Sequence, residues 1–158
     1  MAIYLLSDVG SVGGGWLSSR FMHRGWSINR ARKTTMLICA LMALPVAFAG
    51  QASSLWLAVI IIGIATAAHQ GFSANLYTLP SDVLPRGAVG TVIGIGGMLG
   101  GVGGMVMSKY AGYVLDKIGN YTPIFLVCSV AYLLALAVVH VLMPRMTRVE
   151  IPAAPVAA

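Results

Sequence analysis

The chain has 158 residues, of which 58% are hydrophobic and 9% are charged, and its formal net charge is +6. An ordinary soluble domain is about 25% charged, so these few charges could not cover the surface of a soluble globule. A chain whose outer face meets lipid needs no such cover. The basic residues lie between apolar segments, which argues against a nucleic-acid-binding protein. Composition therefore predicts an all-α integral membrane protein surrounded by lipid.

Five apolar segments are candidate membrane spans. A bilayer core about 30 Å thick requires about 20 apolar residues in a helix. Segments that approach or exceed this length cover residues 3–19, 34–50, 55–79, 88–115 and 123–143. We therefore expect about five transmembrane helices within residues 1–144. Residues 145–158 are expected to form a disordered cytoplasmic tail, because they are rich in Pro and Ala.

The positions of Lys and Arg predict which ends of the segments face the cytoplasm. Residues 20–33 carry five basic residues, residues 81–87 carry one, and the tail carries two. With the first of these on the inside, alternation places all three there, and only Lys109 and Lys117 remain outside. The sequence thus predicts a multi-pass protein of the cell (inner) membrane with a cytoplasmic C-terminus. An outer N-terminus that starts at the edge of a span without a signal suggests a partial bundle that lacks earlier helices.

The fourth segment is dense in glycine. Several of its glycines are four residues apart, and such spacing of small residues lets helix backbones approach closely in lipid. Two interpretations are open: packing alone, or a helix that slides or bends during a conformational cycle. The glycines are Gly90, Gly94, Gly96, Gly97, Gly100, Gly101, Gly103 and Gly104.

Polar residues gather in the second half of the third segment. Thr66, Gln70, Ser73 and Tyr77 recur at intervals of three and four residues, so they share one helix face. Polar groups in a span face the bundle interior or a wet cavity. This face could bind a hydroxylated or carboxylated solute, or it could form hydrogen bonds between helices. The neighbouring His69 is a candidate proton relay or a packing residue.

Few other residues are candidates for chemistry. Asp8 is the one carboxylate of the first segment and is either a functional intramembrane acid or a solvated interfacial residue. Cys39 and Cys128 lie in separate apolar segments and are expected to be small packing residues. The sequence contains no nucleophile and base at catalytic spacing and no metal-binding motif, so we expect no catalytic residues, metal or cofactor. An intramembrane enzyme is accordingly disfavoured.

The segment Gly14–Arg20, followed by His23-Arg24-Gly25, resembles the second-half copy of the loop motif of the major facilitator superfamily. The matching motif residues are Gly15, Arg20, Arg24 and Gly25. Ser19 stands where the motif normally has aspartate.

Other segments extend the resemblance. Residues 69–82 and 85–90 resemble the anion:cation symporter branch of that superfamily. Residues 94–98 and 111–113 are similar to hexuronate and related sugar-acid transporters. The resemblance implies helices 8–12 of a twelve-helix fold, with the N-terminal half required to complete it.

The resemblance also implies an activity, which is uptake of a small carboxylated sugar with proton symport by alternating access. Gln70, Ser73, Tyr77 and Gly97 would then line the solute cavity, and the chain alone is not expected to transport. The expected partners are membrane lipid, the solute and protons. The alternative is a membrane scaffold or assembly subunit that packs through the glycine-rich helix.

Overall fold

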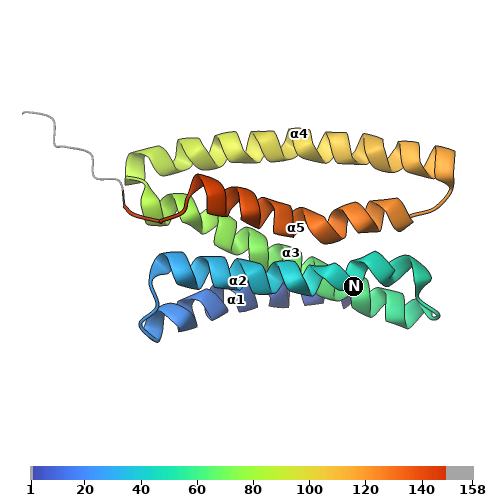
Figure 1. Cartoon of the computed structure of the whole chain (residues 1–158), viewed down its shortest axis with the longest axis horizontal. Helices are drawn as coiled ribbons and strands as arrows, with labels where there is room; N and C mark the ends of the chain where they lie inside the picture. Colours follow the sequence, from blue (N-terminus) through green and yellow to red (C-terminus); the bar gives the residue numbers. More distant parts are fainter. Residues whose placement is uncertain (1, 149–158) are drawn as a thin grey trace, which may run out of the picture.

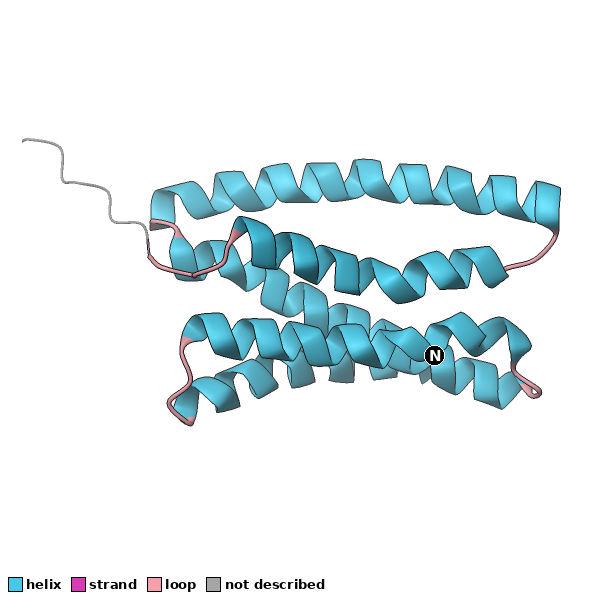
Figure 2. Cartoon of the chain, in the orientation of Figure 1, coloured by secondary structure: helices cyan, strands magenta, loops and turns pink. Residues whose placement is uncertain are grey.

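A computed structural model describes residues 2–148, which fold into α-helices joined by short turns (Figures 1 and 2). No strand occurs within these residues, which confirms the predicted all-α class. Residues 149–158 of the predicted tail lie outside the described part of the chain. The helices are α1 (Ala2–His23), α2 (Ile28–Ala43), a 3₁₀ helix η1 (Leu44–Gln51), α3 (Leu55–Val83), α4 (Arg86–Ile118) and α5 (Thr122–Leu142).

Four helical stretches of the described chain are long and apolar enough to cross a membrane. They are Ile28–Gln51, which joins α2 to η1, and the helices α3, α4 and α5. α1 has 22 residues, but glycines, serines and Asp8 dilute its apolar content. The chain is a multi-pass membrane protein, and α1 is the one predicted span that does not reach this apolar length.

Local sequence explains where the helices begin and end. The Ser27 side chain accepts a hydrogen bond from the backbone N–H of Arg30, so α2 begins before the predicted apolar segment. Pro45 follows the end of α2, and the chain continues there as a 3₁₀ helix because proline cannot donate the helical hydrogen bond. α3 continues past Pro80 to Val83, so it is one turn longer than predicted.

The helices alternate in direction, and the basic segments meet at one end of the bundle. The α1–α2 turn, the α3–α4 turn and the end of α5 all lie at the left of Figure 1. The α4–α5 connection lies at the opposite end, together with the turn before α3. The fold thus brings together the three basic segments that the sequence predicts on one side.

The core lies between α2, α3 and α5. Met36 and Ala40 of α2 are fully buried against Ala68 and Phe72 of α3, and Leu136 of α5 packs on this cluster. These aliphatic and aromatic contacts stabilise the three helices through close packing. Lipid tails are as apolar as these side chains, so the hydrophobic effect contributes little to helix association here.

The closest approach between helices is the crossing of α1 and α3. Gly10 and Gly14 of α1 lie directly against Ala67 and Gly71 of α3, and a methyl group added to either α1 glycine would overlap the α3 backbone. Small residues four apart on both helices therefore allow backbone contact. The sequence contains this reciprocal pattern, yet its density of glycine points to the fourth segment instead.

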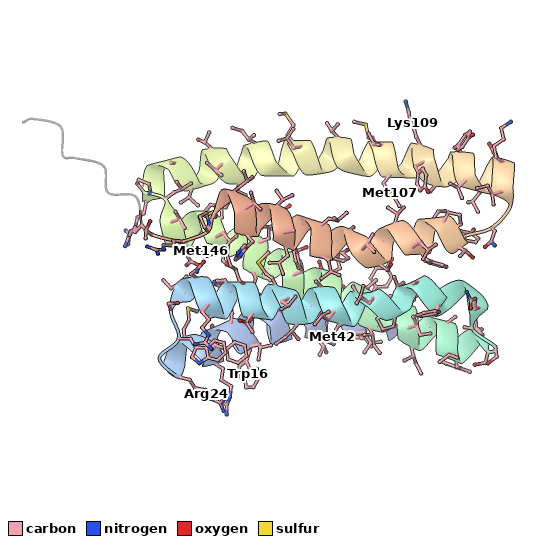
Figure 3. All side chains as sticks on the ribbon, viewed as in Figure 1. Trp16, Arg24, Met42, Met107, Lys109 and Met146 are labelled. Carbon is pink, nitrogen blue, oxygen red and sulfur yellow. The ribbon has the colours of Figure 1, made fainter. Side chains whose placement is uncertain are left out.

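The glycines of α4 are not packed within the described chain. A Cβ added at any of them from Gly87 to Gly112 would meet no atom within 4 Å, and Val114 is the buried residue of this helix. In Figure 3, Met107 points from α4 toward α5, whereas Lys109 points away from the bundle. The α4 glycines thus have no packing partner within residues 2–148, and both interpretations of them stay predictions. Small residues permit a close contact but do not supply a partner.

Candidate functional site: a polar face on α3 and an arginine network

α3 is the central helix of the described chain, and its neighbours occupy different faces of it. α1 covers the face that contains Gly71, and the core buries Phe72 on the side of α2. His69 faces α5, where its Nδ1 lies 2.8 Å from the hydroxyl of Tyr132. Between the α1 and α5 contacts lies one further sector of α3, and at its C-terminal end Tyr77 and residues of α4 line the same groove.

The predicted polar face lies in that sector. Thr66, Gln70, Ser73 and Tyr77 share it by their helical spacing, and the Tyr77 side chain is 49% exposed. The Thr66 hydroxyl donates to carbonyl oxygens of its own helix. The side chains of Gln70 and Ser73 form no hydrogen bond with another residue in 2–148 and are half-buried. An amide, a hydroxyl and a phenol are therefore available to a solute or to another helix.

His69 connects α3 to α5. The hydrogen bond to Tyr132 can run in either direction, because the tautomer of the imidazole decides which atom donates. The tyrosine ring also lies 5.4 Å from the ring of Phe72, in a tilted arrangement. His69 lies three residues after Thr66 and four before Ser73, so it borders the polar face on the side of α5, and Thr66 and His69 line one pocket with Tyr132.

A buried arginine network joins α1, α2 and α3 at the basic end of the bundle. Arg32 of α2 is 9% exposed. Its Nε donates to Oδ2 of Asp82 on α3 at 3.0 Å. Its Nη1 donates to Oγ of Ser18 on α1 at 3.0 Å and to Oδ1 of Asn75 on α3 at 3.2 Å. One guanidinium thus binds both neighbouring helices through charge-assisted hydrogen bonds.

Asn75 extends the network into the α1–α3 crossing. Its Nδ2 donates to the carbonyl oxygens of Gly14 at 3.0 Å and Gly71 at 2.9 Å. In the sequence, Asn75 lies within the polar second half of the third segment and Arg32 within the basic stretch 20–33, and neither pattern names a partner. The sequence did indicate that Ser18 and Asn75 lie at the α1–α3 crossing, because each continues the row of small residues on its helix by one turn. The pairing with Arg32 required the fold.

The residues of the predicted loop motif shape the α1–α2 turn. Gly25 has a φ of 86°, a left-handed conformation that favours glycine. The Arg20 guanidinium lies 5.2 Å from the ring centre of Trp16, and Arg24 is exposed at the turn (Figure 3). Gly15 has open space beside it. Of these residues, Gly15 touches the network around Arg32, because its carbonyl oxygen accepts a hydrogen bond from Ser18 Oγ at 3.0 Å.

The remaining predicted residues lie apart from the polar face. Asp8 is exposed on α1 beside a shallow hollow that Val9 and Trp16 also line. Gly97 is exposed on α4. Within residues 2–148, no group of three His, Cys, Asp or Glu side chains is placed to hold a metal ion.

Comparison with known proteins finds several transporters that are similar to this chain in sequence. The chain is 29% identical over 93% of its length to the hexuronate transporter of Escherichia coli strain K12. It is 28% identical over 90% of its length to a probable galactarate/D-glucarate transporter of the same strain, and 24% identical over 85% to the D-galactonate transporter of Escherichia coli O6:H1. The chain resembles sugar-acid transporters. It spans about a third of the length of these relatives, which are named as transporters rather than enzymes. No family model matches the chain.

Proposed function

We propose that this chain forms part of a secondary active transporter for small organic anions, in particular hexuronates or related sugar acids. The observation that carries the proposal is the polar face of α3 in a chain that resembles sugar-acid transporters over 93% of its length. Transport would be coupled to proton symport and would proceed by alternating access around a site near the membrane midplane.

The proposal assigns the chain to helices 8–12 of a major facilitator fold in the cell (inner) membrane. The basic end and the C-terminus would face the cytoplasm, as the excess of Lys and Arg there favours. Further helices would supply the opposite wall of the cavity. Gln70 and Ser73 support this assignment, because they have no hydrogen-bond partner within residues 2–148 and a polar face exposed to lipid would be costly.

The depth of the polar face supports a solute role. Gln70 is the sixteenth of the 29 residues of α3, so it lies near the middle of the span. Gln70, Ser73 and Tyr77 offer donors and acceptors that match the hydroxyl groups of a sugar acid. The face carries no cation, so pairing with the solute carboxylate would come from the opposite wall. Gly97 would let the solute approach the α4 backbone.

A chimera tests the proposal. We would replace the matching third of the Escherichia coli hexuronate transporter with this chain and measure uptake of radiolabelled glucuronate into vesicles. Gln70→Leu and Tyr77→Phe should each lower uptake at sub-saturating solute about ten-fold, since one lost hydrogen bond in a dry site is worth roughly 1.5 kcal/mol. Tyr113→Phe is the matched control, because Tyr113 is exposed on α4 away from this face. Unchanged uptake in both Gln70→Leu and Tyr77→Phe would indicate that these side chains pack against other helices and do not contact the solute.

Proton coupling would be assigned to His69 or Asp8. His69 already has a hydrogen-bond partner in Tyr132, which suits a relay. His69→Gln should therefore make uptake by the chimera independent of an imposed pH gradient, while Asp8→Asn distinguishes the second candidate. If neither change affects the gradient dependence, the coupling groups lie outside this chain.

A second candidate is a membrane scaffold or assembly subunit that packs through α4. The observation that favours it is the row of open glycines along that helix. A chimera that reaches the membrane but carries no sugar acid, together with a stable complex that Gly97→Leu disrupts, would favour this alternative.

A further inference from the structure

An apolar groove opens between α3, α4 and α5 at the basic end of the bundle. Its volume is about 510 Å³, within the range of small-molecule sites. Leu79 and Val83 of α3, Ile93 of α4, and Val139 and Met143 beside α5 form its walls. The lining suits a hydrocarbon chain and offers almost no hydrogen bonds to a soluble molecule.

Three basic residues follow or contact residues that line this groove. Arg86 comes two residues after Leu84, which lines the groove, and Arg145 comes two residues after Met143. Both arginines are exposed. Lys33 donates from Nζ to the carbonyl oxygen of Met143 at 2.6 Å, which fixes its charge at the same edge.

The nearby carboxylate does not cancel these charges. Asp82 precedes Val83 of the groove wall, but it is paired with Arg32 through a 3.0 Å ion pair. The edge of the groove is therefore electropositive while its interior is apolar. This combination matches an amphiphile with a negatively charged head.

We infer that the groove binds one acyl chain of an anionic phospholipid, whose phosphate lies between Arg86 and Arg145. Basic pockets between membrane helices are known to favour anionic headgroups. Because lipid tails already lie in an apolar medium, burial of the chain gives little preference among lipids. Headgroup charge therefore sets the selectivity, and the shape of the groove sets how long the lipid stays. Tyr77 of the proposed solute face also lines this groove, so the variants below are placed at residues outside that face.

Native mass spectrometry of the full chain in detergent tests the charge component. Phosphatidylglycerol and phosphatidylcholine are titrated separately, and the ratio of their affinities is measured. Each of Arg86→Gln and Arg145→Gln should reduce the preference for phosphatidylglycerol about five-fold. Lys109→Gln and Lys117→Gln make the same charge change toward the other end and should leave the ratio unaltered. A ratio that survives loss of both arginines would overturn the inference.

A second pair of variants tests the apolar component. Gly100 lines the groove, whereas its neighbour Gly101 does not, and both have open space around them. Gly100→Leu should shorten retention of both lipids, while Gly101→Leu should bind as the parent chain does. Equal binding by the two variants would contradict an occupied groove. Competition by glycerol phosphate as strong as that by the whole lipid would show a soluble-anion site and overturn the lipid assignment. If Gly100→Leu loses helicity, the arginine variants alone decide.

Discussion

The network around Arg32 makes a strong prediction about stability. Asp82→Leu removes the carboxylate that pairs with Arg32, whose side chain is 11% exposed. Loss of one partner from a buried pair costs about 3–5 kcal/mol, but the Asp82 side chain is 22% exposed, so we expect about 3 kcal/mol. Arg32→Met removes the charge and leaves the Asn75 oxygen without its donor, at a cost of about 2 kcal/mol.

The double variant distinguishes an energetic coupling between Arg32 and Asp82 from two independent losses of stability. With Arg32 already replaced, loss of Asp82 leaves no buried charge behind. We therefore expect the double variant to cost about 2 kcal/mol, so that the two single effects exceed the double by roughly 3 kcal/mol. The measurement is the free energy of unfolding in detergent, followed by circular dichroism during denaturant titration. Arg30→Met is the control, because Arg30 is exposed and stacks on Trp26 at the same end. Single effects that add within about 0.5 kcal/mol would refute the network.

Three further predictions use the same unfolding titration. Gly14→Ala should destabilise by about 2–3 kcal/mol because its methyl group would overlap the α3 backbone, whereas Gly13→Ala, with open space, should stabilise by about 0.5 kcal/mol; equal effects would contradict the α1–α3 crossing. Gly25→Ala should cost about 1–2 kcal/mol because its φ is 86°, and an unchanged stability would exclude that turn. Tyr132→Phe should cost about 1 kcal/mol through loss of the bond to His69, and this loss should vanish in a His69→Phe background.

Sequence reasoning recovered the helices well because hydropathy and turn residues act locally. The segments 55–79 and 123–143 match α3 and α5 within a few residues, and Pro85 directly precedes α4. The largest error lies at α2, which begins at Ile28 although the apolar run starts later. Ser27 explains that start, since a capping side chain acts at a helix end whatever the hydropathy of the next turn.

Local sequence does not determine which neighbouring helix each side chain contacts. Helical spacing assigns Gln70 and Asn75 to faces of one helix, but it does not say which face meets another helix. Asn75 donates to the Gly14 carbonyl oxygen of α1, whereas the half-buried Gln70 has no hydrogen-bond partner within residues 2–148. Similarly, Arg32 and Asp82 are 50 residues apart, and only the folded bundle brings them together.

Solute protection of a single cysteine tests the central claim most directly. In the chimera with Cys39→Ala and Cys128→Ala, Ser73→Cys should react with a water-soluble thiol reagent, and glucuronate should slow that reaction at least several-fold. Leu134→Cys, which is exposed on α5, should be insensitive to glucuronate. A Ser73→Cys thiol that is unreactive, or that reacts at the same rate with and without glucuronate, would contradict a solute-lining role for the polar face of α3.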